Sequence, residues 1–268
     1  MSTEYESLDW YDIPRYYDIV FDTDTQTDAN FLEEACKQYC RPESRKRALR
    51  VLEPACGSGR LVLEMARRGY RVTGIDLSDP MLSFARERLK RLNLSAQLHK
   101  ADMAEFKTRD GYFDMAHCLV SSFKYLLSES DAVSHLKSVA RALRPGGIYV
   151  LAFHLSDYSD TSVSRERWVA ERDGTRVVCT ITGWPPDRKR RLENVRSRIV
   201  VTESDGQLRK AETNWQFRTY NVNEARRLLA AVPELQLLAL HDFAMEIDYT
   251  RELDDGQLDT VFILRKTD

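Results

Sequence analysis

Residues 49–60 read Leu-Arg-Val-Leu-Glu-Pro-Ala-Cys-Gly-Ser-Gly-Arg, a short apolar run that leads into a loop with two glycines. The run has the length of a buried strand, and the residues from Arg60 to Arg68 have helical spacing. Gly57 and Gly59 allow the backbone to turn tightly and to approach a ligand. The start of the helix offers N–H groups that have no partner within the helix. This stretch therefore predicts a strand, a ligand-binding loop and a helix.

Short apolar runs and helical patterns alternate along most of the chain. Besides residues 49–53, the runs with strand character cover 70–76, 96–99, 113–119, 148–153, 234–241 and 258–265. The other patterns with helical spacing cover 29–39, 78–92, 131–143 and 223–231. Such alternation is typical of βαβ units, in which helices join parallel strands. We therefore expect a parallel sheet with helices packed on it.

The alternation breaks after Phe153. Residues 165–220 contain four strand-like runs, and the dipeptides Asp173-Gly174 and Asp205-Gly206 join them in pairs. A two-residue Asp-Gly between such runs is typical of a β-hairpin. These residues are therefore expected to form antiparallel hairpins inserted into the α/β pattern.

The composition excludes several classes of protein. No apolar run approaches the roughly 20 residues that a membrane span needs, and the acidic N-terminus Met1–Glu4 does not resemble a signal peptide. The five cysteines are an odd number and form no C-x-x-C pair, which is typical of a reducing compartment. A cytoplasmic globular protein without a membrane partner is expected.

The net charge of -2 hides two segments of opposite charge. Residues 1–34 contain ten acids and one base, whereas residues 164–210 contain twelve bases and seven acids. Opposite charge would draw the N-terminal segment and the expected hairpins together.

Asp76 and Glu53 indicate the kind of ligand. Asp76 ends the expected strand that follows the glycine loop, where a carboxylate can accept both hydroxyls of a ribose, unless it only caps the next helix. A dinucleotide site normally has a small residue at the position of Val62. Glu53 would repel a pyrophosphate but suits an ammonium group. The pattern favours a nucleoside cofactor with an amino group over NAD.

Residues 53–59 resemble motif I of the class I S-adenosylmethionine-dependent methyltransferases. The resemblance extends through Gly74–Ser78, Ala101–Met103 and Leu143–Gly147. Residues 16–21 and 121–126 add a narrower resemblance to a branch that acts on small molecules. Deoxysugar N-methyltransferases and glycine- or sarcosine-type N-methyltransferases belong to that branch.

The resemblance implies a fold class and a division of the chain. The expected fold is α/β, with a Rossmann-like, mostly parallel seven-stranded sheet, an antiparallel final strand, and an inserted antiparallel β-sheet lid. Residues 1–44 would form an N-terminal helical lid segment. Residues 45–157 and 221–268 would form the cofactor-binding core, and residues 158–220 the insert on the acceptor side.

The resemblance also implies a binding site for S-adenosyl-L-methionine. Its expected residues are Tyr17, Glu53, Ala55, Cys56, Gly57, Gly59, Asp76, Leu77, Met81, Asp102, Met103 and Leu119. Glu53 and the carbonyl of Leu119 would hold the amino group, and Asp76 the ribose. Leu77, Met81, Asp102 and Met103 would surround the adenine.

Tyr17 and His154 are the candidate catalytic residues. By resemblance, Tyr17 would lie beside the transferred methyl group, and packing in the core is its alternative role. His154 follows an expected strand near the site, where it would be a base or a structural histidine. His117 has the same two alternatives, and no metal site is expected.

The expected function is methyl transfer to a small-molecule acceptor, with an amine nitrogen as the favoured nucleophile and S-adenosyl-L-homocysteine as product. Two alternatives remain open. One is a nucleic-acid (tRNA) methyltransferase that uses the basic insert, although the overall charge does not favour a nucleic-acid partner. The other is a non-catalytic module that binds S-adenosylmethionine. A homodimer is also left open.

Overall fold

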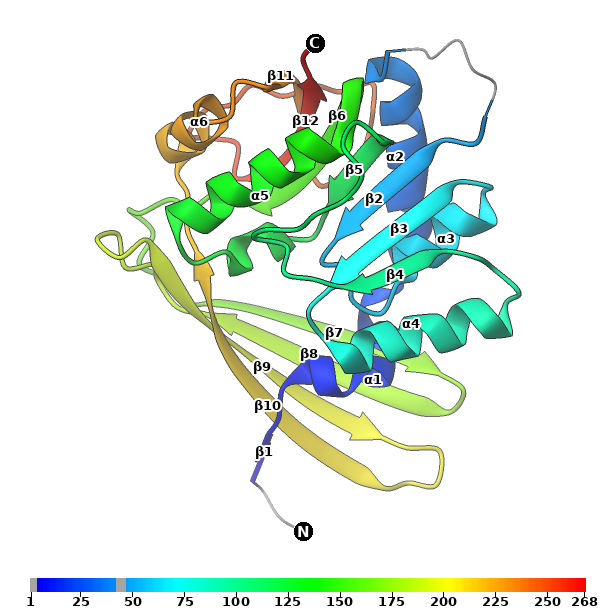
Figure 1. Ribbon diagram of the computed structural model, residues 1–268. Helices are drawn as coiled ribbons and strands as arrows, with labels where there is room; N and C mark the ends of the chain where they lie inside the picture. The colour runs from blue at the N-terminus through cyan, green and yellow to red at the C-terminus, as the bar shows by residue number, and fades with distance from the viewer. Residues whose placement is uncertain (1–3, 42–46) are drawn as a thin grey trace.

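The computed structural model describes residues 4–41 and 47–268, which form two β-sheets and six α-helices (Figure 1). The expected boundary between residues 44 and 45 and the first three residues lie outside the described parts.

The larger sheet has seven strands in the order β11-β12-β6-β5-β2-β3-β4. Their bounds are β2 Arg50–Pro54, β3 Arg71–Asp76, β4 Gln97–Lys100, β5 Phe113–Cys118, β6 Leu143–His154, β11 Leu235–His241 and β12 Asp259–Lys266. Neighbours among β2 to β6 pair in parallel, whereas β12 runs antiparallel to both β6 and β11. The expected mostly parallel sheet with an antiparallel final strand is confirmed.

Helices cover both faces of this sheet because its strands carry apolar residues on both sides. In β2, Val51 packs into a core with α2, α3 and α4, whereas its neighbour Leu52 packs into a core with α5 and α6. The helices are α2 Thr25–Tyr39, α3 Arg60–Arg67, α4 Asp79–Arg91, α5 Glu129–Ala142 and α6 Val222–Ala230. Among the helices of the described residues, none combines the length and apolar character that spanning a bilayer requires.

The smaller sheet has five strands in the order β1-β10-β9-β8-β7. Four of them come from the region of expected hairpins: β7 Ser164–Arg172, β8 Thr175–Gly183, β9 Leu192–Thr202 and β10 Leu208–Arg218. They pair antiparallel in sequence order. The fifth, β1 at Glu6–Ser7, pairs in parallel with β10, so the start of the chain extends this sheet.

The N-terminal segment also packs on the smaller sheet. A 3-10 turn at Trp10–Asp12 leads into α1, Pro14–Phe21, and α1 contacts β7, β8 and α4 (Figure 1). A third apolar core forms here, in which Trp10, Ile19 and Val20 meet residues of β8 and β9. Because α1 contacts both α4 and the smaller sheet, it joins the two halves of the molecule.

Asp114 lies near the start of β5, at the end of the larger sheet that is opposite the glycine loop. Its buried carboxylate accepts hydrogen bonds from both terminal nitrogens of Arg47 at 2.7 and 3.0 Å. Arg144 Nε donates to it at 2.6 Å and the backbone N–H of Arg50 at 2.8 Å. Burial alone would raise the pKa of Asp114, but these bonds outweigh burial and lower it.

Replacement of Asp114 by asparagine leaves two guanidinium groups without their carboxylate. We expect Asp114→Asn to lower the free energy of unfolding at pH 7 by roughly 3–5 kcal/mol, the usual cost of breaking a buried ion pair. Because its pKa is depressed, Asp114 stabilises the fold above the unfolded pKa of about 3.9. The difference between wild type and variant should therefore shrink as the pH falls below that value. Urea unfolding measures this difference in stability, with the exposed Asp110→Asn as control. Equal stabilities of wild type and Asp114→Asn at pH 7 would contradict the stabilising role of Asp114.

Candidate functional site

The loop between β2 and α3 is bent by residues in the left-handed region. Gly57 has φ 52° and Gly59 φ 75°, and Ala55 adopts φ 56° although it carries a side chain. A Cβ on Gly59 would lie 2.9 Å from the Cβ of Ala85, so glycine there also allows α3 to approach α4. Non-glycine residues with positive φ are uncommon and concentrate at functional sites. The loop is therefore held in a costly conformation by its surroundings.

Asp76 at the end of β3 connects this loop to the next one. Its carboxylate accepts the backbone N–H of Gly57 at 2.7 Å and that of Ser78 at 2.8 Å. Burial raises the pKa of Asp76, and the two N–H bonds act in the opposite direction. A carboxylate has about four acceptor sites, so two bonds leave capacity for hydroxyl groups. The helix cap itself is the side chain of Ser78, which accepts from Met81 N.

Glu53 is a buried carboxyl group with an unused oxygen. Glu53 is 7% exposed, and its Oε2 has no hydrogen-bond partner among the described residues. Burial raises the pKa of Glu53 to about 8, although Arg60 acts to lower it. A buried polar atom without a partner is costly. A ligand ammonium group would remove that cost.

Three cavities meet beside the glycine loop. The loop cavity, of about 340 Å³, is lined by Glu53, Arg60 and Leu119 among others. The Asp76 cavity, of about 500 Å³, is lined by Asp76, Leu77 and Met103. The aromatic cavity, of about 400 Å³, lies between the N-terminal segment, β6 and the smaller sheet. Ala55 and Gly57 line the loop cavity and the Asp76 cavity, whereas Tyr17 and Ser122 line all three.

Most residues expected in the cofactor site lie on these cavities, but three do not. Met81 is fully buried in α4 and lines none of the three. Gly59 serves the contact between α3 and α4 described above. Asp102 is exposed and accepts the N–H of Ala104, while its neighbours Ala101 and Met103 line the Asp76 cavity. The expected place of Met81 beside the adenine stays a prediction. Cys56 lines the loop cavity, and its sulfur fills the space beside Gly74.

A buried histidine supports the backbone at Met103, and it was not predicted from the sequence. His135 of α5 is buried, and burial lowers its pKa to about 4. Its Nδ1 lies 2.7 Å from the carbonyl of Met103, so the neutral ring must carry its proton there. Nε2 then accepts the hydroxyl of Tyr149 at 2.7 Å. The chain of bonds holds one wall of the Asp76 cavity in place.

Tyr17 lies in α1 among other aromatic side chains. Burial raises its pKa to about 12, so its hydroxyl keeps its proton at neutral pH. Nearby, the hydroxyl of Tyr11 donates to that of Tyr125 at 2.8 Å, where the aromatic cavity and the Asp76 cavity adjoin. Tyr11 and Tyr125 come from positions 114 residues apart, and the sequence analysis did not identify Tyr11.

Strain is also concentrated just after β5. Val120 and Ser121 both have positive φ, 56° and 61°, although neither is glycine. Two adjacent residues in this conformation cost of order 1–3 kcal/mol each. They direct the 3-10 turn Ser122–Tyr125 toward the cavities, with Ser122 where all three meet. This turn lies within residues 121–126, for which the sequence resembles the branch of methyltransferases that acts on small molecules.

The two candidate histidines have different surroundings. His154, at the end of β6, lines the aromatic cavity, and its Nδ1 lies 2.7 Å from a carboxylate oxygen of Asp259. Its Nε2 is therefore the nitrogen available to a ligand. His117 is fully buried in β5, and within the described chain neither ring nitrogen has a hydrogen-bond partner. Burial lowers the pKa of His117 to about 3, so it is neutral. It lines none of the three cavities.

The aromatic cavity carries an excess of negative charge. Four carboxylates and one ammonium group line it: Asp157, Asp160, Glu166, Glu193 and Lys124. Lys124, whose side chain is 4% exposed, donates to Glu193 at 2.6 Å and lies 5.2 Å from the ring centroid of Phe217. Nine aromatic residues form much of the remaining wall: Trp10, Tyr11, Tyr17, Phe21, Tyr125, Trp168, Trp184, Trp215 and Phe217.

Comparison with known proteins relates this site to a family. Residues 51–147 match the family model described as a methyltransferase domain. YqeM of Bacillus subtilis, which is named a methyltransferase with no stated substrate, is 36% identical over 124 residues, covering 46% of this chain and 49% of YqeM. The dTDP-3-amino-3,4,6-trideoxy-alpha-D-glucopyranose N,N-dimethyltransferase of Streptomyces venezuelae is 31% identical over 130 residues, covering 48% of this chain and 52% of that enzyme.

The match therefore spans about half the length of these two curated relatives. A solved structure extends the likeness of fold to the whole chain. The sugar N-methyltransferase KedS8 of a Streptoalloteichus species superposes with a TM-score of 0.72 at 19% identity, covering 100% of this chain and 97% of KedS8. Residues 51–147, with the loop of two glycines and Asp76, therefore match a methyltransferase domain, and the whole chain shares the fold of a sugar N-methyltransferase.

Proposed function

We propose that the protein transfers a methyl group from S-adenosylmethionine to the nitrogen of a small-molecule amine. The observation that carries this proposal is the meeting of three cavities at Tyr17 and Ser122. Two of them share the glycine loop, and the third is enclosed by aromatic and acidic side chains. A donor and an acceptor that enter from opposite sides would meet at this junction.

The residues around the two loop-side cavities fit the donor. Glu53 has an unused buried oxygen for an ammonium group, and Asp76 has free acceptor capacity for ribose hydroxyls. Leu77, with 57% of its surface exposed, lines the Asp76 cavity together with Met103, so apolar side chains are available to a flat base. The described side chains thus match each chemical part of the nucleoside and its amino-acid tail.

S-adenosylmethionine supplies, when bound, a methyl group on a sulfonium centre that is already activated for displacement. The acceptor nitrogen forms the new bond to carbon as the carbon–sulfur bond breaks, the electron pair remains on sulfur, and the nitrogen then loses a proton. The protein's part in such a reaction is to align the two reactants and exclude water. Tyr17 keeps its proton, so it acts here by positioning and hydrogen bonding and not as a base.

The lining of the aromatic cavity favours an amine over a carboxylic acid. Aromatic faces attract cations, and four carboxylates against one ammonium group add to that attraction. A carboxylate acceptor would meet repulsion in the same place. The amine must be neutral when it reacts. We assign the removal of its proton to Nε2 of His154, with Asp259 orienting the ring.

The smaller sheet and the N-terminal segment would together cover the acceptor. Trp168 of β7 and Phe21 of α1 line both the loop cavity and the aromatic cavity, and their ring centroids lie 6.1 Å apart. The boundaries proposed for this cover are residues 1–44 and 158–220, with residues 45–157 and 221–268 as the core that binds the donor.

An acceptor screen tests the proposed function. The purified protein is incubated with S-adenosylmethionine and panels of amines, alcohols, carboxylic acids and tRNA, and release of S-adenosylhomocysteine is measured. We expect turnover with members of the amine panel. Turnover with tRNA alone would favour a nucleic-acid methyltransferase, and binding of S-adenosylmethionine without turnover on any panel would favour a non-catalytic module. Either result would overturn the proposal.

Glu53 should make binding of the donor depend on protons. With a pKa of about 8, its carboxyl group is mostly protonated at pH 7 and must ionise to pair with an ammonium group. We expect wild type to release more protons on binding than Glu53→Gln, and the variant to bind roughly 10-fold more weakly. Calorimetry in buffers of different ionisation enthalpy measures both, with the exposed Glu105→Gln as control.

The same pKa predicts how the free protein responds to pH. The folded pKa of Glu53 lies above the unfolded value of about 4.3, so the folded state holds an extra proton between the two. The stability of free wild type should fall as the pH rises from about 4 to 8, and this contribution should be missing in Glu53→Gln. Identical proton release and identical pH dependence in the two proteins would remove Glu53 from the site.

Tyr17→Phe should lower turnover more than donor binding. The ring that separates the three cavities remains, but the hydroxyl that positions the reacting groups is lost. We expect kcat to fall about 10-fold or more, with the dissociation constant of S-adenosylhomocysteine within about 3-fold of wild type. The best amine from the screen is the substrate, and Tyr39→Phe on α2 is the control. An unchanged kcat would return Tyr17 to a role in packing.

His154→Gln should lower turnover more than donor binding. If Nε2 takes the proton, its loss should lower kcat about 10-fold or more and leave the dissociation constant of S-adenosylhomocysteine within about 3-fold of wild type. Asp259→Asn should also lower kcat, because the ring loses the carboxylate that orients it. His99→Gln, at an exposed position of β4, should leave kcat unchanged. An unchanged kcat in His154→Gln would show that the residue is not the base.

A further inference from the structure

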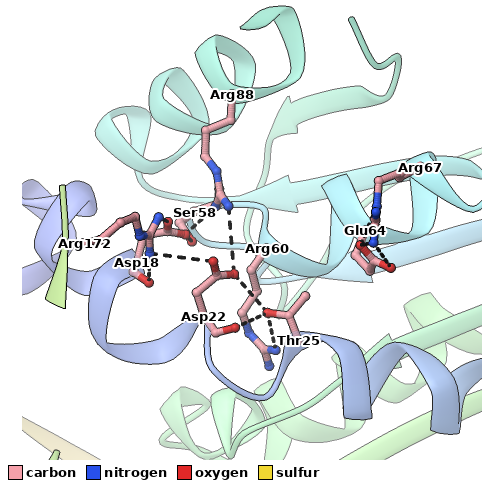
Figure 2. A network of polar contacts seen from close by, with 9 residues as sticks. All are labelled: Asp18, Asp22, Thr25, Ser58, Arg60, Glu64, Arg67, Arg88 and Arg172. Carbon is pink, nitrogen blue, oxygen red and sulfur yellow. Dashed lines mark hydrogen bonds and ion pairs between the residues drawn. The ribbon is translucent and has the colours of Figure 1, made fainter. Parts of the chain in front are cut away.

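Asp18 of α1 is a buried carboxylate that binds side chains from three other segments, the glycine loop, α4 and β7. Its side chain is 0% exposed and accepts the hydroxyl of Ser58 at 2.7 Å and Arg172 at 2.7 Å. Arg88 of α4 donates to the same carboxylate, and Arg172 donates a second time, to the backbone carbonyl of Asp18 at 2.8 Å. Figure 2 shows Arg88 and Arg172 reaching this aspartate from different elements.

These partners belong to the parts of the molecule that would hold donor and acceptor. Ser58 stands between Gly57 and Gly59 in the glycine loop. Arg172 ends β7, one strand of the smaller sheet. The backbone carbonyl of Ser58 also accepts Arg88 at 3.3 Å, so the loop is held through both its side chain and its main chain. A single carboxylate therefore joins the donor loop to the sheet on the acceptor side.

The periodicity of the two elements links these bonds to the cavities. In α1, Tyr17 and Phe21 are four residues apart and line the cavities, whereas Asp18 and Asp22 occupy the adjacent face. Asp22 lies 3.9 Å from Arg88 and 3.7 Å from Arg172. In β7, Glu166, Trp168 and Arg172 share one face because successive side chains alternate. Arg172 thus lies on the strand that carries three residues of the aromatic cavity, Ser164, Glu166 and Trp168.

We infer that Asp18 is a positioning residue that couples occupancy of the glycine loop to the docking of β7 over the acceptor. A ligand on the loop fixes Ser58, Ser58 and Arg88 fix the carboxylate, and the carboxylate fixes Arg172 and with it Trp168. The inference rests on donor binding at the loop, as proposed above. By reciprocity, loosening of β7 must then weaken binding at the loop.

The test uses Arg172→Met and Ser58→Ala, because removal of Asp18 itself would leave two guanidinium groups without a partner and endanger folding. Arg167→Met is the matched control: it makes the same change on the same strand, at an exposed position outside the cavities. S-adenosylhomocysteine is the probe. Calorimetry gives its dissociation constant, and hydrogen exchange gives the protection of residues 164–183 with and without it.

In wild type and Arg167→Met we expect the probe to slow exchange across residues 164–183. In Arg172→Met and Ser58→Ala this slowing should be lost, and the dissociation constant should rise about 5-fold or more. Unchanged affinity together with retained protection in either variant would overturn the inference, as would lack of protection in wild type that binds the probe. Failure of wild type to bind the probe at all would instead overturn the proposed function.

Discussion

The hydrogen bond from the backbone N–H of Gly57 to the carboxylate of Asp76 joins the ends of two neighbouring parallel strands. Neighbouring parallel strands end at the same edge of a sheet, so the loops that follow them lie side by side. Here one carboxylate accepts an N–H from each loop, and a left-handed glycine lets the first loop turn toward it. Gly57 lines both the Asp76 cavity and the loop cavity, so this contact lies where the two adjoin.

A second constraint acts on α1, a short helix that packs aromatic side chains on one face and binds charged groups on another. One face carries the aromatic rings of Tyr17 and Phe21 and the other carries carboxylates, because positions four apart lie above one another. The smaller sheet and the glycine loop both bind α1 at Asp18, through Arg172 and Ser58. A helix of eight residues could not keep this position by its own propensity. Its place depends on the aromatic core with β8 and β9 and on the ion cluster around Asp18.

The sequence was sufficient to predict the larger sheet, since segments such as 148–153 are uninterrupted apolar runs and helices such as 79–91 begin at a capping serine. The hairpins followed from two Asp-Gly turns. The short strand Glu6–Ser7 was not predictable, because two residues carry no periodicity and its partner lies about 200 residues away.

The candidate site was predictable only where a local motif carries it. Gly57 and Asp76 belong to loops with a recognisable pattern, and both lie on the cavities. Met81 is fully buried, so its predicted contact with the adenine is not visible as a cavity wall. The Lys124–Glu193 pair and the Tyr11–Tyr125 contact join residues 69 and 114 positions apart, so only the folded chain brings them together.

The opposed charges of the N-terminal segment and the insert illustrate the same limit. Their sums suggested a general attraction, yet the contacts between the two segments are specific and run in both directions. Arg172 of the insert pairs with Asp18, whereas Arg15 of the acidic segment reaches back to Glu203 of the basic one, at 3.5 Å. A general attraction would weaken smoothly with salt. A pair whose carboxylate is wholly buried is screened far less, so its contribution should persist at ionic strengths that remove the surface pair.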